Sequence, residues 1–249
     1  MTHIYRRRRR RILITLTSLF LAFIIAFTGV AAYISDYYEA DEEGLSQIMS
    51  ENTRTYRTSL DTTVFVNGGA KYGLIFYPGA KIDDRAYMPL MQACYNAGIF
   101  CVLVRMPYRL AFFNYDVADE IVKKHTGITE WYIAGHSLGG AMAAEHLKNT
   151  ELDYAGLILL GSYSAADLSD TSLSVLSIYG SEDEILNMEK YEKNKENLPE
   201  DFMEVVIDGG CHSYFGMYGM QKGDGTPTIT NVQQIEITAE YICDFIIGK

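Results

Sequence analysis

From about residue 62 onward, apolar runs alternate with amphipathic segments along the chain. Ile99–Val104, Trp131–Ala134 and Gly156–Leu160 carry no charge and are rich in apolar side chains, as expected for strands buried on both faces of a sheet. Segments with helical periodicity lie between such runs; in residues 84–97 the apolar positions recur every three to four residues. Strands that alternate with helices predict an α/β fold with a mostly parallel, doubly wound sheet and helices on both faces.

The same pattern predicts the other elements of this part of the chain. They are, in chain order, a β-hairpin of Val64–Val66 and Tyr72–Tyr77 joined through Asn67-Gly68-Gly69, helices over 115–124 and 137–148, a strand over 175–179, a helix over 187–197, a strand over 203–207 and a closing helix over 230–247.

A different apolar pattern occupies the N-terminus. Ile12–Ile34 contains 23 residues without a charge, and a helix needs roughly 20 such residues to cross a bilayer. Arg6–Arg11 precedes this run, and positively charged flanks stay in the cytoplasm. We therefore expect a single-pass anchor in the cell membrane, with the N-terminus cytoplasmic and the remaining chain outside. The alternative is a signal peptide cleaved near Val30-Ala31-Ala32, which would release a secreted domain.

These patterns divide the chain into four parts. We expect an Arg-rich cytoplasmic tail at 1–11, a transmembrane anchor or signal peptide at 12–34, an acidic juxtamembrane stalk at 35–60 and a folded α/β domain at 61–249.

Charge and cysteine content exclude some classes of partner. Outside the Arg run, the chain contains 15 basic and 32 acidic residues. A surface with this excess of negative charge repels nucleic-acid phosphates, so we expect no nucleic-acid partner. The four cysteines match no metal-site spacing, and we expect neither a metal nor a cofactor. In an exported domain these cysteines either form a disulfide or remain buried thiols.

The strongest motif is Gly135-His136-Ser137-Leu138-Gly139, a G-x-S-x-G pattern between a predicted buried strand and an Ala-rich helix. A strand that turns sharply into a helix crowds the positions beside the serine, which favours glycine there. The turn exposes the Ser137 hydroxyl at the carboxyl end of the sheet, beside the N–H groups that begin the helix. This context predicts that Ser137 is a nucleophile.

A serine nucleophile requires a base and an acid that orients the base. In this type of fold the acid and then the histidine follow the serine in the chain. His212 is the histidine that follows the last predicted strand, in a glycine-rich loop. Three acids compete in the loop after the strand at 175–179, and Asp183 is preferred over Glu182 and Glu184 because of its spacing after Gly180. We expect a triad of Ser137, Asp183 and His212.

An oxyanion hole requires two N–H donors directed at the developing negative charge. The amide of Leu138 is expected to be one donor. The second is expected in the loop that begins with Pro78, which has no N–H. Gly79 allows close approach there, so Ala80 is our choice and Lys81 the second candidate.

Four segments together resemble the α/β-hydrolase superfamily: Phe76–Lys81, Gly135–Gly140, Tyr179–Asp183 and Gly209–Gly216. They look most similar to its small, lidless branch, which is related to dienelactone hydrolases and bacterial carboxylesterases. The resemblance covers residues 62–247. Pro78 departs from the pattern, since many members have His there, and this puts the shape of the oxyanion loop in doubt. Few residues precede the first clear strands, so we expect fewer than the usual eight strands.

The resemblance also bears on the pocket. Cap domains in this superfamily enter after the sixth strand, and Gly161–Leu173 is too short to hold one, so we expect an open site for an accessible small-molecule or lipid-like ester. We expect aromatic and Met side chains to line an apolar groove. The candidates are Met106, Tyr108, Phe112, Tyr163 and Phe215.

The resemblance implies hydrolysis of a carboxylic ester or thioester through an acyl-enzyme on the serine. Two alternatives remain at this point. An acyltransferase would pass the same acyl group to an alcohol, and a non-catalytic member of the fold would act as a surface binding module.

Overall fold

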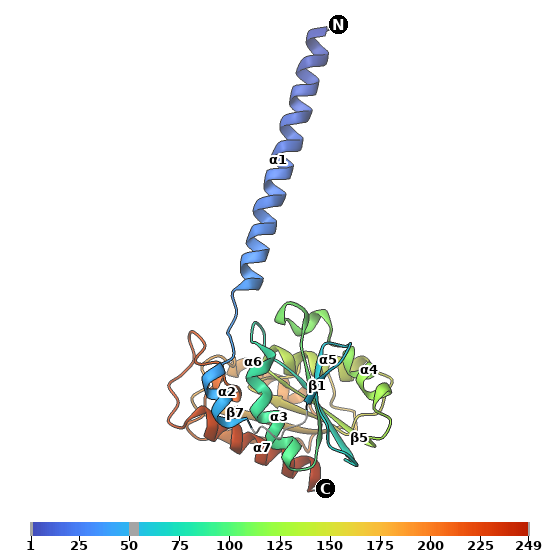
Figure 1. Cartoon of the computed structure of the whole chain (residues 1–249), viewed down its shortest axis with the longest axis vertical. Coiled ribbons are helices and arrows are strands. Elements are labelled where there is room, and N and C mark those ends of the chain that lie inside the picture. Colours follow the sequence, from blue (N-terminus) through green and yellow to red (C-terminus); the bar gives the residue numbers. More distant parts are fainter. Residues whose placement is uncertain (1, 50–54, 249) are drawn as a thin grey trace. The chain divides into compact units, whose positions relative to one another are not determined.

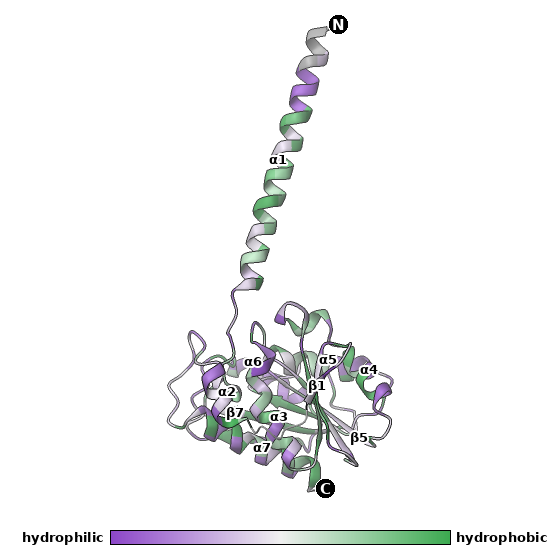
Figure 2. Ribbon diagram, in the orientation of Figure 1, coloured by the Kyte–Doolittle hydropathy of each residue, from purple (hydrophilic) through white to green (hydrophobic). Residues whose placement is uncertain are grey.

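The computed structural model describes residues 2–49 and 55–248, which form two units divided between Tyr37 and Tyr38. The first unit is the single helix α1 (Thr2–Ser35), and its stretch Arg7–Ser35 is long and apolar enough to cross a membrane. Figure 2 shows this helix as mostly green beyond a purple band at the arginine run. A membrane span and a signal sequence both have this length and composition.

The second unit contains one eight-stranded sheet with the strand order β1-β2-β4-β3-β5-β6-β7-β8 (Figure 1). β1 and β2 pair antiparallel, β2 and β4 also pair antiparallel, and all later neighbours pair in parallel. The strands are β1 (Thr55–Arg57), β2 (Thr62–Phe65), β3 (Tyr72–Tyr77), β4 (Phe100–Val104), β5 (Glu130–His136), β6 (Gly156–Leu160), β7 (Ser174–Gly180) and β8 (Met203–Ile207).

The sheet separates two hydrophobic cores because successive side chains of a strand point to opposite faces. In β3, Leu74 and Phe76 join the core that α3 and α7 cover, whereas Ile75 and Tyr77 join the core that α4 and α5 cover. Both faces of the central strands are therefore buried, which confirms the predicted three-layer α/β fold.

Seven α-helices and five short 3₁₀ turns fall within the described residues. Beside α1, the helices are α2 (Glu42–Ile48), α3 (Met88–Asn96), α4 (Val117–Lys124), α5 (Leu138–Asn149), α6 (Met188–Asn194) and α7 (Asn231–Ile247). The 3₁₀ turns are η1 (Asp84–Tyr87), η2 (Pro107–Arg109), η3 (Ala111–Phe113), η4 (Lys195–Asn197) and η5 (Ser213–Phe215).

Two expectations about the sheet are wrong. β2 and β3 form no hairpin, because β4 lies between them and pairs with both. The sheet has the full eight strands, since Thr55–Arg57 adds a short antiparallel strand beside β2 at the edge. The hairpin error arises because the pairing of β2 with β4 joins residues that lie far apart in the sequence, which local spacing does not report. The strand count is wrong because Thr55–Arg57, which pairs with the nearby β2, falls in the segment expected to be a stalk.

The segment expected to be a stalk differs from that prediction over residues 38–49. Tyr38 forms a parallel bridge with Ile82, and Ala40 and Leu45 are buried in the core that also contains α3 and α7. Asp41 caps α2 by accepting a hydrogen bond from the Gly44 N–H. Leu45 and Ile48 give this short helix its apolar contacts with the domain. Residues 1, 50–54 and 249 of the predicted parts lie outside the described residues.

The segment between β6 and β7 contains no helix and no strand. The thirteen residues 161–173 therefore hold no cap domain, as expected from the sequence. The carboxyl ends of the parallel strands are left open at this position, which is where ligands bind in open α/β sheets.

Candidate active site

Ser137 stands at the turn between β5 and α5, where it is the residue before the first helical position. Its backbone has φ 52° and ψ −122°, a strained conformation for a residue with a side chain. The turn is tight enough to require glycine on both sides. A Cβ on Gly135 would lie 2.3 Å from the carbonyl carbon of Gly139, and a Cβ on Gly139 would lie 2.1 Å from the Tyr77 oxygen. The motif therefore builds the sharp turn that presents the serine.

His212 and Asp183 form a buried pair. Nδ1 of His212 lies 2.8 Å from Oδ2 of Asp183, and both side chains are almost fully buried. Asp183 follows β7, and His212 lies in the loop after β8, so two neighbouring parallel strands bring them together. With the Asp183 carboxylate as acceptor, the bond is donated by Nδ1–H of His212, and it fixes the orientation of the ring.

The second oxygen of Asp183 explains why this acid, rather than either neighbour, faces the histidine. Oδ1 accepts hydrogen bonds from the backbone N–H of Ile185 at 3.0 Å and of Leu186 at 2.7 Å. Glu184 is exposed, and Glu182 is only partly buried. One carboxylate therefore both orients His212 and holds the loop at 185–187.

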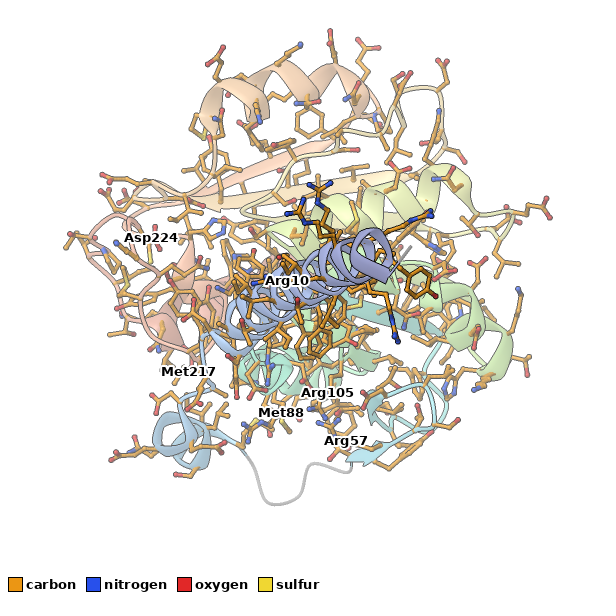
Figure 3. The ribbon with its side chains drawn as sticks, turned by 90° about the horizontal axis from the view of Figure 1, so that it is seen from above. Arg10, Arg57, Met88, Arg105, Met217 and Asp224 are labelled. Atoms are coloured by element: carbon orange, nitrogen blue, oxygen red, sulfur yellow. The ribbon has the colours of Figure 1, made fainter. Side chains whose placement is uncertain are left out.

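A further carboxylate, Asp224, organises the loop that carries His212. Its oxygens accept hydrogen bonds from the Ser213 N–H at 2.7 Å, the Ser213 hydroxyl at 2.6 Å and the His212 N–H at 3.3 Å. Burial opposes ionisation of Asp224, but the hydrogen bonds from Ser213 hold its pKa below the usual range. Asp224 lies in the loop between β8 and α7 (Figure 3), and sequence analysis did not select it.

Ser137 and His212 line the same cavity of about 270 Å³. Residues 161–163 after β6, residues 185–187 after Asp183, and two residues of α5 complete its wall. Nε2 of His212 has no hydrogen-bond partner among the described residues, so the Ser137 hydroxyl is not bonded to it in this structure. The cavity thus brings together Ser137 and the oriented side chain of His212.

The two expected oxyanion donors, Ala80 and Leu138, lie on segments that contact each other. A Cβ added to Gly139, next to Leu138, would lie 2.5 Å from the carbonyl oxygen of Pro78, in the loop that contains Ala80. The N–H of Gly79 donates to the Tyr87 hydroxyl at 3.2 Å, and the N–H of Lys81 donates to the Arg109 oxygen at 2.9 Å. The N–H groups of Ala80 and Leu138 make no hydrogen bond within the described part of the chain. These two amides are left available for a ligand oxygen.

His136, the second residue of the motif, is fully buried and packs 4.5 Å from the His212 ring, centroid to centroid. Its Nδ1 lies 2.7 Å from the hydroxyl of Tyr87, the side chain that also accepts from Gly79. Burial, and then the nearby His212, lower the pKa of His136 well below its usual value. His136 is therefore neutral, and with Tyr87 it connects the turn that carries Ser137 to the loop that contains Gly79.

Of the five residues expected to line the pocket, only Tyr163 lines the cavity that contains Ser137. Met106 is buried in the core beneath α4 and α5, and Phe215 is fully buried, with its ring 5.4 Å from the His136 ring. Tyr108 and Phe112 are instead 58% and 47% exposed. Sequence analysis missed the other residues that line the cavity: Ala141, Gly161, Ser162, Ile185, Leu186 and Asn187.

All four cysteines are free thiols, and Cys94, Cys101 and Cys211 are buried. Within the described residues, no three His, Cys, Asp or Glu side chains form a group able to hold a metal ion.

Comparison with known proteins agrees with this architecture. Solved structures that share the fold include a dienelactone hydrolase from Anabaena variabilis, at 13% identity with a TM-score of 0.56 over 79% of this chain and 100% of that chain. They also include a monoacylglycerol lipase from Paleococcus ferrophilus, at 12% identity with a TM-score of 0.57 over 77% of this chain and 99% of that chain. An esterase from Thermogutta terrifontis matches at 13% identity with a TM-score of 0.52 over 80% of this chain and 95% of that chain.

A search of curated protein sequences finds no match. The profile of the alpha/beta hydrolase family, however, matches residues 73–236, which is well over half of the chain. That match contains both the G-x-S-x-G turn and the pair of Asp183 and His212. The chain therefore belongs to the alpha/beta hydrolase family.

Proposed function

We propose that this chain is a membrane-anchored serine hydrolase, similar to carboxylesterases, that cleaves an ester or thioester through an acyl-enzyme. The observation that carries the proposal is the 2.8 Å contact between His212 and Asp183 beside a cavity that Ser137 also lines. The fold is shared with proteins named as an esterase and a monoacylglycerol lipase, which supports an ester as the bond that is cleaved.

The proposed reaction uses each group at a stated atom. Because Asp183 holds the proton of His212 on Nδ1, Nε2 is the atom that takes the Ser137 proton while Oγ attacks the carbonyl carbon. The N–H groups of Ala80 and Leu138 stabilise the resulting oxyanion. The tetrahedral intermediate then expels the alcohol or thiol, which receives the proton from Nε2. Water repeats the sequence on the acyl-enzyme and releases the acid.

This reaction requires the Ser137 hydroxyl to approach Nε2 of His212. Both groups line one cavity, and hydrogen bonds of this kind are often long in the absence of substrate. A small acyl group suits the cavity, which is only about 270 Å³. We expect turnover to fall as the acyl chain is lengthened in a series of soluble p-nitrophenyl esters.

The membrane anchor in this proposal is α1, whose apolar stretch follows an arginine run. Retention of those arginines in the cytoplasm would place the hydrolase domain outside the cell membrane. Carbonate extraction of membranes, followed by mass spectrometry of the N-terminal peptide, tests this part. A chain that begins near Ala32 and leaves the membrane would show instead that the segment is a cleaved signal peptide.

A fluorophosphonate probe tests the nucleophile directly. We expect wild type to become labelled and Ser137→Ala to remain unlabelled. Ser162→Ala is the matched control, because this second cavity serine donates its hydroxyl to the Ser137 carbonyl at 2.7 Å and should still permit labelling. Equal labelling of wild type and Ser137→Ala would refute the assignment. Ester products formed with added alcohols would indicate an acyltransferase, and an unlabelled, inactive wild type would indicate a binding module.

A further inference from the structure

Three aromatic side chains project from the domain next to the oxyanion loop. Tyr108, Phe112 and Phe113 are 58%, 47% and 53% exposed, and we call this group the aromatic tip. The Phe112 and Phe113 rings lie 4.2 Å apart, and the Tyr108 and Phe113 rings lie 5.6 Å apart, centroid to centroid. The tip is therefore one contiguous apolar patch, of the kind that marks a site of interaction with a protein or a membrane.

The segment that carries the aromatic tip is basic, whereas the domain as a whole is acidic. Residues 105–115 contain two arginines and no acid, although the domain as a whole is strongly acidic. Arg105 is exposed and forms an ion pair with Asp84, as Arg57 does; Figure 3 shows Arg105 and Arg57 close together. Aromatic side chains flanked by arginine are typical of the interface between lipid headgroups and acyl chains. An acidic domain approaches an anionic bilayer most favourably through its basic segment.

The covalent connection between α1 and the domain indicates that the membrane surface is near the aromatic tip. α1 ends at Ser35, and Tyr38 is already held in the domain: its N–H donates to the Lys81 oxygen at 2.8 Å. Lys81 in turn donates its N–H to the oxygen of Arg109, within the segment that carries the tip, at 2.9 Å. The chain from Ser35 to Tyr38 spans at most about 10 Å, whatever the orientation of the domain. The membrane that holds α1 is therefore tethered to the part of the domain that presents the tip.

We propose that the aromatic tip docks into the headgroup region of the phospholipid bilayer that anchors α1. This proposal rests on the membrane anchor of the proposed function. η3, which carries Phe112 and Phe113, lies beside α5, the helix that begins after Ser137. Docking would therefore hold the domain with the nucleophile helix and the oxyanion loop close to the lipid surface.

Quenching by brominated lipid tests the proposal on the full-length chain. The protein is reconstituted into phosphatidylcholine–phosphatidylglycerol vesicles with or without lipid brominated near the headgroup. Phe113→Trp is compared with Met203→Trp, a position on β8 that is 49% exposed and far along the sheet from the tip. Trp131, the only native tryptophan, is buried and contributes the same background to both variants.

We expect brominated lipid to reduce the added fluorescence of Phe113→Trp at least about twofold and to leave that of Met203→Trp unchanged. Equal quenching of the two variants on vesicles that retain the chain overturns the docking surface alone. A chain that does not float with the vesicles refutes the anchor and the docking together. Soluble-ester turnover and probe labelling report separately on the hydrolase.

A second copy of the chain is the competing occupant of the tip. The variant Y108S/F112S/F113S is therefore compared with wild type in detergent by light scattering. An unchanged mass is expected. A dimer in wild type that dissociates in this variant, together with unquenched Phe113→Trp, would assign the tip to contact between protomers and overturn the proposal.

Discussion

Gly161 offers a sharp test of the proposed catalytic pair, because it is the first residue after β6 and faces both members. A Cβ at this position would lie 2.9 Å from Nδ1 and 3.1 Å from Cε1 of His212, and 3.2 Å from Oδ2 of Asp183. Non-bonded heavy atoms pack at about 3.5–4.0 Å. Gly161→Ala must therefore move the His212 ring or the Asp183 carboxylate by several tenths of an ångström.

The expected effect has two parts. Gly161 has φ +51°, and the left-handed conformation costs a residue with a side chain about 1–2 kcal/mol. Displacement of the ring by up to an ångström costs up to about 10²-fold in rate. We expect Gly161→Ala to lower the free energy of unfolding by about 1–3 kcal/mol and kcat by about 10-fold to 10²-fold, with little change in KM for a small soluble ester.

Gly69→Ala is the matched control. Gly69 has φ +83° and nothing within 4 Å of its missing Cβ, so this variant carries the backbone strain alone. Its stability should fall by about 1–2 kcal/mol, while its kcat should stay within about twofold of wild type. Urea unfolding and p-nitrophenyl acetate hydrolysis measure both quantities. If Gly161→Ala keeps the kcat of the Gly69→Ala control, the reaction does not depend on the geometry of His212 and Asp183.

Three further outcomes follow from the site. Ala80→Pro removes one oxyanion N–H and should lower kcat about 10²–10³-fold, whereas Ala80→Gly retains the donor and should stay close to wild type in steady-state assays. Asp224→Asn places an amide against the N–H and hydroxyl of Ser213, so we expect a lower Tm by calorimetry and a kcat reduced about tenfold or more, because the loop that holds the base loosens. His136 stays neutral in the fold but binds a proton when unfolded, so stability should fall as pH drops below about 6.5, by up to about 1.4 kcal/mol per pH unit. Urea unfolding between pH 7 and 5 should show a shallower decline for His136→Gln, and an unchanged slope would contradict the assignment.

The central strands were predictable because each is a short apolar run bounded by polar or turn residues. Gly156–Leu160 and Met203–Ile207 have the bounds that the sequence predicts. β2 was harder to place, because 34 residues separate it from its neighbour β4, and the Asn67-Gly68-Gly69 turn suggests a local hairpin that does not form. Apolar periodicity identifies strands, but the identity of a strand's partner depends on packing across the whole sheet.

How well the sequence predicted each residue of the candidate site depended on the kind of sequence signal that the residue carries. The G-x-S-x-G turn has a steric reason for each glycine. The position after the last predicted strand selected His212 from the histidines, and spacing after Gly180 selected Asp183 over Glu182 and Glu184. Asp224 carries no such signal, since it lies beyond η5 in an irregular loop. The residues at 185–187 carry a weak sequence signal. Asp183 accepts hydrogen bonds from the N–H groups two and three positions later, and Asp often forms such a turn with the backbone that follows it.

Side-chain type alone does not place an apolar residue of a loop. Met106, Phe112 and Phe215 are chemically alike, yet Met106 and Phe215 are buried and Phe112 is exposed. In a helix or strand the period of the pattern reports which face is buried, but loops have no period. Their burial depends on neighbours that are distant in sequence, such as His136 for Phe215. The exposed aromatic tip is therefore informative because nothing in the described domain covers it, although the sequence had placed two of its positions near the substrate.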